Sequence, residues 1–146
     1  MMNSIETTGP ALQIRVTSPE IKVEGSKKYV LYTVKFQSTS PVFEQNESVV
    51  QRRYSQFEWL FNELEKSDVK MIVPPLPDRA LTRQIPFFTK DSSFDETFIE
   101  DRRQGLETFL SKVVAYPLAQ NERSLHFFLF EADFDLHKYV RGRMRR

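Results

Sequence analysis

The sequence contains no cysteine, and its 146 residues include only four glycines and two histidines. Without cysteine, the chain can form no disulfide, no thiolate metal site and no cysteine nucleophile. The glycines are scattered and make no phosphate-binding loop, and His126 and His137 lack the spacing of metal ligands. His126 lies in an apolar stretch, so we interpret it as a packed or capping residue rather than a base. These absences predict that the chain is not an enzyme and has no cofactor and no metal site.

Long apolar runs and an excess of one charge are also missing. No stretch approaches the roughly 18 consecutive apolar residues of a membrane-spanning helix, and the first residues lack the pattern of a secretory signal peptide. Lysine and arginine total 21 against 20 aspartates and glutamates, so no overall field attracts nucleic acid. We therefore expect a cytoplasmic protein whose membrane contact is peripheral and which has no nucleic-acid partner.

The residues that are present predict one core and a small sheet. A hydrophobic fraction of 40% with 13% aromatic residues is enough for one core. Apolar and polar residues alternate in three early segments, which predicts strands joined by short loops in an antiparallel meander. These segments are residues 12–16, 29–36 and 48–53.

Two capping boxes predict where helices begin. Ser55 with Glu58 would start a helix directly after the third strand, where apolar residues then follow at helical spacing. Ser93 with Glu96 would start the longest helix, whose apolar stripe extends to about Tyr116.

The order of these elements predicts the fold class. Strands first and helices afterwards indicate an α+β fold, in which a three-stranded antiparallel sheet packs against a helical subdomain. The run Val73–Pro77 is a proline-rich loop, because proline lacks the amide donor and clashes with the preceding helical turn. A short final helix is expected at residues 125–129. We divide the chain into a flexible arm (1–10), a folded domain (11–136) and a basic, frayed tail (137–146).

The motif Arg52-Arg53-Tyr54 brings two guanidinium groups to an aromatic ring at the expected joint between strand and helix. An arginine fork matches phosphate oxygens, and a flat ring can support the apolar face of a sugar or an inositol. The alternative is an edge strand with solvated arginines and a tyrosine that staples the helix. Alternation puts Arg53 and Tyr54 on opposite faces, so both line one pocket only if the strand ends there.

The predicted long helix carries two residues that its apolar stripe does not explain. Arg102 lies between Ile99 and Leu106, where a charge is costly unless something pairs with it. That partner is either a ligand or one of the chain's own carboxylates. Gly105 costs a helix about 1 kcal/mol relative to alanine, which indicates a close approach to its backbone.

Together these motifs resemble the phox-homology (PX) domain. The resemblance is carried, in this order, by Arg52-Arg53-Tyr54-Ser55-x-Phe57-x-x-Leu60, Pro74-Pro75-Leu76-Pro77 and Arg102-Arg103-Gln104-Gly105-Leu106. It covers almost the whole chain, and residues 98–100 and 117–123 are similar to the short, single-domain sorting nexins of endosomes. The resemblance implies binding of phosphoinositides, most often phosphatidylinositol 3-phosphate, in a pocket between the sheet, the proline loop and the long helix.

The resemblance also implies a role for each matching residue. Arg53 would bind the 3-phosphate, Tyr54 would stack beneath the inositol, and Arg102 would bond the 4- and 5-hydroxyls. Arg79, where the family usually has a lysine, would contact the 1-phosphate, and Arg52 would be structural. The protein would then act on the cytosolic face of endosomal membranes in protein sorting and retrieval, with a retromer-type coat and cargo tails as partners.

An apolar cluster of Ile85, Phe87 and Phe88 falls in the interval that holds the family's membrane-insertion loop. We expect these side chains to enter the acyl boundary of the membrane, and the alternative is a loop core. In a second function, the chain would be a protein adaptor with weak or no lipid specificity. Pro74-x-x-Pro77 would then be a ligand for an SH3 domain, unless these prolines only shape their own loop.

Overall fold

The computed structural model describes residues 11–68, 70–77 and 94–144. Its sheet is antiparallel with the order β1-β2-β3, as predicted, and its strands are longer than the predicted segments. They are β1 (Leu12–Glu24), β2 (Lys27–Ser38) and β3 (Glu47–Arg53). The described helices are α1 (Tyr54–Lys66), α3 (Glu96–Ala115) and α4 (Arg123–Phe130), with short 3-10 turns at Ala119–Asn121 and Leu136–Lys138. None of these helices is long and apolar enough to cross a membrane.

Alternation along the strands separates a buried face of the sheet from an exposed face. The buried side chains form one core with residues of α1, α3 and α4. They are Ile14, Val16, Tyr32, Val34, Phe36 and Val50. The opposite face carries exposed, mostly polar side chains, which are Gln13, Arg15, Lys35, Gln37, Glu47 and Val49. The predicted α+β fold, a three-stranded sheet against helices, is therefore confirmed.

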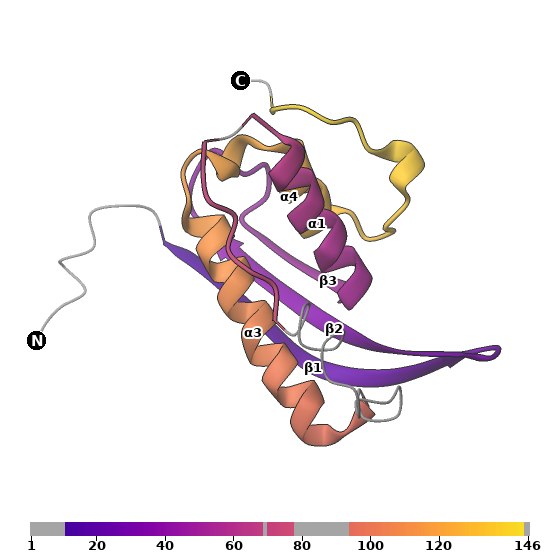
Figure 1. Cartoon of the computed structure of the whole chain (residues 1–146). Helices are drawn as coiled ribbons and strands as arrows, with labels where there is room; N and C mark the ends of the chain where they lie inside the picture. The colour runs from indigo at the N-terminus through magenta and orange to yellow at the C-terminus, as the bar shows by residue number, and fades with distance from the viewer. Residues whose placement is uncertain (1–10, 69, 78–93, 145–146) are drawn as a thin grey trace, which may run out of the picture.

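β1 and β2 form a long hairpin that extends past the end of β3. Their pairing continues to Glu24 opposite Lys27, and Gly25 supplies the positive φ of 62° for the tight turn. β3 ends at Arg53, opposite Leu31, so the turn end of the hairpin lacks a third strand and projects away from the helices (Figure 1). This difference in strand length leaves a step in the sheet beside Arg53.

The helix α1 begins at Tyr54, one residue before Ser55. Arg53 is the N-cap residue, and its backbone N–H donates a hydrogen bond to the side-chain oxygen of Gln56 at 2.9 Å. The predicted capping box of Ser55 and Glu58 is therefore wrong. β3 stays paired to its last residue, Arg53, so the chain passes directly from strand into helix.

The helix α3 begins at Glu96, and Asp95 is its N-cap, with its carboxylate accepting a hydrogen bond from a backbone N–H at 3.2 Å. Because the N-cap is Asp95 and Glu96 is the first helical residue, the predicted capping box of Ser93 and Glu96 is wrong; Ser93 itself lies outside the described residues. Along its length, α3 covers the open edge of β1. Val16 donates its N–H to Glu107 at 2.9 Å, and Arg103 donates to the carbonyl oxygen of Val16 at 2.9 Å. These bonds hold α3 in a defined rotation against the sheet.

The end of the chain returns over α1. The Tyr139 ring packs against Trp59 with ring centroids 4.9 Å apart, and Arg141 donates two hydrogen bonds of 3.0 Å to the carboxylate of Glu63. Glu63 is only 6% exposed, so its charge needs a partner, which Arg141 supplies. The expectation of a frayed end is therefore wrong for residues 137–144.

Candidate functional site

A cavity of about 220 Å³ lies at the step in the sheet, where β3 ends and α1 begins. Three basic side chains line it, and no acidic residue is among its lining residues in the described part of the chain. The lining residues are Lys28, Tyr29, Val30, Tyr32, Arg53, Tyr54, Ser55, Phe94 and Arg102. Such a basic and aromatic pocket suits an anionic ligand that has an apolar face.

The junction of strand and helix explains how Arg53 and Tyr54 share this cavity. Because β3 ends at Arg53, alternation no longer governs Tyr54, and both side chains line the pocket. The guanidinium carbon of Arg53 lies 4.0 Å from the ring centroid of Tyr29, a cation-π contact that holds the arginine side chain against the hairpin. The condition that the sequence set for one shared pocket is met.

Arg102 reaches the same cavity from α3. Its guanidinium carbon lies 3.8 Å from the ring centroid of Tyr54 and 4.7 Å from that of Phe98. Consecutive residues of an α-helix are about 100° apart, so with Arg103 held at the edge of β1, Arg102 turns toward the step. The unexplained charge in the apolar stripe therefore belongs to the pocket.

The proline loop is fastened to the pocket at Pro77. The hydroxyl of Tyr54 donates a hydrogen bond of 2.9 Å to the carbonyl oxygen of Pro77. A Cβ atom at Gly105 would lie only 2.4 Å from Cβ of Pro77, so the loop packs directly on the helix backbone. The close approach predicted at Gly105 is confirmed, and it is made by the proline loop.

Arg52, although adjacent to Arg53, points into the core and is fully buried. Its Nε donates to the carbonyl oxygen of Phe128 at 3.0 Å, and its Nη1 and Nη2 donate to the carbonyl oxygens of Gln51 and Glu131. Burial lowers the pKa of Arg52 to about 10, and the charge of Glu131 opposes that shift. Arg52 therefore stays charged at neutral pH and ties β3 to the end of α4, a structural role as predicted.

His126 is a packed residue, as interpreted from the sequence. Its Nε2 lies 2.7 Å from the carbonyl oxygen of Gln120, and its ring stacks on Phe43 with centroids 5.2 Å apart. Burial lowers its pKa below the usual value, so it is neutral at pH 7.

Six of the nine lining residues were not predicted as site residues, and three of these six add charge or an aromatic ring next to the predicted bases: Lys28, Tyr29 and Phe94. Lys28 places its Nζ 4.7 Å from the ring centroid of Phe94, and both residues line the cavity. The run Lys27-Lys28-Tyr29 was a visible signal, but only the register of β2 against β3 places it beside Arg53.

Four predicted site residues lie outside the described residues. They are Arg79, Ile85, Phe87 and Phe88. Their roles stay predictions.

An α+β domain in which the sheet, a proline loop and a long helix form a basic and aromatic pocket has the architecture of a PX domain. The family model described as PX domain matches residues 40–132, and this chain belongs to that family. PX-domain sorting nexins are non-enzymatic lipid-binding adaptors, which agrees with the expectation that the chain is not an enzyme.

Two sorting nexins and two solved structures are similar to the chain. Sorting nexin-12 of Homo sapiens is 49% identical over 135 residues, which cover 92% of this chain and 82% of the relative. Sorting nexin-3 of Homo sapiens is 48% identical over 124 residues, which cover 85% and 76%. A designed CISK-PX domain matches with a TM-score of 0.61 and 31% identity over 80% of this chain and 97% of that chain. The mouse SNX19 PX domain with bound sulphate ion matches with a TM-score of 0.54 and 28% identity over 83% and 97%.

Proposed function

We propose that this chain binds the headgroup of phosphatidylinositol 3-phosphate in the cavity at the sheet step and so docks on the cytosolic face of endosomal membranes. The observation that carries the proposal is the convergence of Arg53, Arg102 and Lys28 on one cavity that also holds the ring of Tyr54. Separate elements deliver these bases, namely the end of β3, the helix α3 and the hairpin.

Each described residue has a role that its position supports. Arg53 binds the 3-phosphate, because it lines the cavity and its guanidinium is held against the ring of Tyr29. Tyr54 supports the inositol ring and is held in place by its bond to Pro77. Arg102 bonds the 4- and 5-hydroxyls. Arg79 completes the set at the 1-phosphate in this proposal.

Lys28 adds a further base, so the net charge of the pocket suits a phosphorylated headgroup. The sulphate ion in the structure of the mouse SNX19 PX domain is an anion of similar shape to a phosphate group. It supports anion recognition in a related domain.

On the membrane, Ile85, Phe87 and Phe88 enter the acyl boundary and add apolar affinity to headgroup recognition. The names of the similar sorting nexins support a role in protein sorting, which we place at endosomes. In that role a retromer-type coat and cargo tails are the protein partners that we propose.

The adaptor alternative, in which Pro74-x-x-Pro77 serves as an SH3 ligand, is less favoured. Pro77 packs on Gly105, and its carbonyl oxygen accepts the bond from Tyr54. Val73 and Leu76 are buried in the core. The prolines thus shape this protein's own pocket.

Sedimentation with liposomes that each carry one phosphoinositide tests the lipid assignment. We expect wild type to sediment best with phosphatidylinositol 3-phosphate. Arg53→Ala should weaken this binding about 10-fold to 100-fold, since it removes charge-assisted bonds of roughly 1.5–3 kcal/mol. Arg15→Ala, which removes the same charge from the exposed sheet face, is the matched control and should bind like wild type. A folded Arg53→Ala variant that sediments like wild type would refute the pocket assignment.

A further inference from the structure

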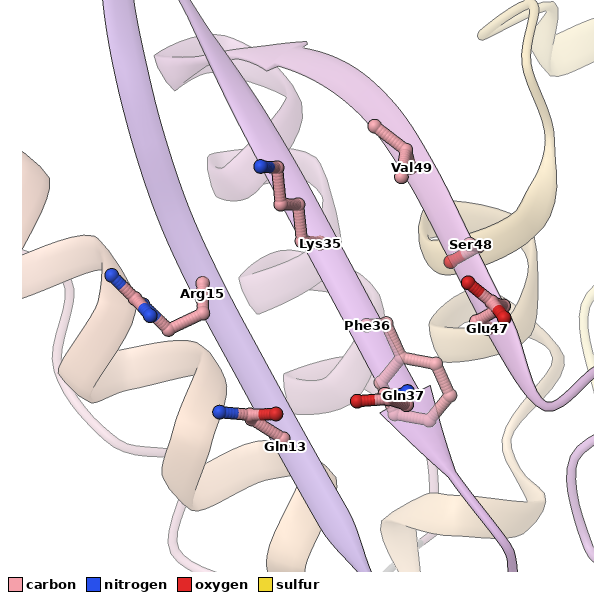
Figure 2. A pocket seen from close by; sticks show the side chains of 8 residues that line it. All are labelled: Gln13, Arg15, Lys35, Phe36, Gln37, Glu47, Ser48 and Val49. Carbon is pink, nitrogen blue, oxygen red and sulfur yellow. The ribbon is translucent and has the colours of Figure 1, made fainter.

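A second hollow, of about 260 Å³, lies on the exposed face of the sheet (Figure 2). The described helices pack against the other face, which holds the core. Two rows of side chains cross the three strands at the hollow. In register, one row is Gln13, Gln37 and Glu47, and the next is Arg15, Lys35 and Val49.

The second row places two basic residues on neighbouring strands, with the Arg15 guanidinium turned toward α3 and the Lys35 side chain free of it (Figure 2). Arg15 stands directly opposite Lys35, and like charges in this position destabilise an antiparallel pair. Nε of Arg15 lies 3.8 Å from Oε1 of Glu107, although the Arg15 side chain is 58% exposed, so this contact offsets only part of the repulsion. Within residues 11–68, 70–77 and 94–144, Lys35 forms no ion pair. A carboxylate between the two cations would relieve the repulsion.

An apolar contact stands beside this charged pair. Val49 is the neighbour of Lys35 on β3 and is 64% exposed. Neighbouring strands are about 4.8 Å apart, so the point midway between Arg15 and Lys35 lies about 7 Å from Val49. Residues i and i+2 of an extended peptide project on the same side and are also about 7 Å apart. In an extended peptide, a carboxylate and an apolar side chain two residues later therefore have the spacing needed to contact the pair of Arg15 and Lys35 and Val49 at the same time.

The adjoining row suits the backbone of such a peptide. The amide groups of Gln13 and Gln37 offer both donors and acceptors to an extended main chain. Glu47, at the end of this row, repels a second carboxylate there and so favours one orientation of an acidic ligand.

The position of the hollow favours a protein ligand over a lipid, a choice that rests on the proposed function. Lys35 is six residues along β2 from Tyr29, which lines the proposed headgroup pocket. At about 3.3 Å per residue, the hollow lies roughly 20 Å from that pocket along the strand. With the pocket on the bilayer, the hollow faces the aqueous side.

We propose that this sheet face binds an acidic, extended peptide segment of a partner protein. One carboxylate of the segment lies between Arg15 and Lys35, and the apolar side chain two residues later packs on Val49.

Nuclear magnetic resonance of the full-length ¹⁵N-labelled protein tests the site without lipid. The probe is a ten-residue peptide that contains the pattern Glu-Ser-Leu twice, and the matched control peptide has lysine in place of each glutamate. We expect the acidic peptide to shift the amide signals of Arg15, Lys35 and Val49 but not that of Arg53. Addition of salt should reduce the shifts, because an ion pair carries the recognition.

Lys35→Glu separates binding from folding. It should weaken peptide affinity at least about tenfold, because repulsion replaces attraction at the carboxylate. Its melting temperature should equal or exceed that of wild type, since Arg15 would then face an opposite charge. Lys112→Glu, an equal charge change at an exposed position of α3, should leave peptide affinity unchanged.

Several outcomes would overturn the proposal. One is the absence of shifts with the acidic peptide, and another is equal shifts with the lysine peptide. Shifts of the Arg15 and Lys35 signals on liposomes would indicate a lipid surface instead. Broadening of those signals by a spin label at Ser4→Cys, a unique thiol in this cysteine-free chain, would show that the N-terminal arm occupies the face. Failure of wild type to bind any liposome would reject the proposed lipid function and leave the peptide result standing.

Discussion

Gly105→Ala is predicted to destabilise the protein, although the same change usually stabilises a helix. The added Cβ would lie 2.4 Å from Cβ and 2.8 Å from Cγ of Pro77, whereas favourable carbon contacts lie at about 3.5–4 Å. The proline loop must therefore move by about 1 Å. Helix propensity favours alanine by about 1 kcal/mol, and overpacking typically costs about 1–3 kcal/mol. We expect a net loss of about 1 kcal/mol and a melting temperature lower by about 2–4 °C.

The same movement should disturb the lipid pocket. The bond of 2.9 Å from the Tyr54 hydroxyl to Pro77 depends on the present position of the loop, so a shift of about 1 Å breaks it. Urea unfolding followed by circular dichroism measures the stability change, and liposome sedimentation measures the loss of binding. We expect both quantities to fall in Gly105→Ala.

A double-mutant cycle isolates the contact. Pro77→Gly removes both clashing carbons, so Gly105→Ala should cost less in that background, with a coupling energy of about 1 kcal/mol. Pro77→Gly alone is the control for the added freedom of the loop. If Gly105→Ala is instead about 1 kcal/mol more stable than wild type and binds liposomes equally well, the contact between the loop and the helix is absent in solution.

Three further predictions concern the pocket, the membrane contact and the end of the chain. Arg102→Ala should weaken liposome binding while its free energy of unfolding stays within about 1 kcal/mol of wild type, since the variant loses cation-π contacts to the half-buried rings of Tyr54 and Phe98; a large fall in melting temperature with lipid affinity retained would assign Arg102 to the fold. Phe87→Ser with Phe88→Ser should weaken liposome binding about 10-fold to 100-fold, and leave affinity for soluble inositol 1,3-bisphosphate and thermal stability nearly unchanged; equal losses for both ligands would place the rings in the pocket. Arg141→Ala should lower the melting temperature at pH 7. Burial raises the pKa of Glu63, but the bonds from Arg141 outweigh it and the pKa is lowered below 4.5. The stabilisation by the ion pair is therefore present above pH 4.5 and is lost as the pH falls through the pKa of Glu63 in the folded protein. The difference in melting temperature between Arg141→Ala and wild type should shrink in acid. A difference that grows in acid would contradict this prediction.

The local pattern of apolar and polar residues was sufficient to predict most strands and helices of the fold. Alternation marked the three strands, and helical spacing marked α3 and α4, because burial on one side of an element imposes its period on the nearby sequence. The N-cap of α1 was predicted at Ser55, two residues after the observed N-cap Arg53. Ser55 with Glu58 is a good local cap, but pairing of Arg53 with β2 extends the strand up to the helix. A tertiary contact thus overrode a local preference.

Only the tertiary structure shows which residues distant in the sequence contact each other. Arg52 and Arg53 are the same residue type, and their different roles depend on carbonyl groups at the end of α4 and on the ring of Tyr29. The charge of Arg141 is plain in the sequence, but its partner Glu63 is 78 residues away, which is why the end of the chain was wrongly expected to fray.

By itself, the sequence determined the α+β class, the family resemblance, the candidate bases Arg53 and Arg102 and the anomaly at Gly105. Each of these is a property of neighbouring residues. Only the tertiary structure brought Lys28 to the pocket, set Pro77 on Gly105 and placed like charges opposite each other across β1 and β2. The physical reason is that strand register and helix packing are set by the shared core, which no single segment encodes.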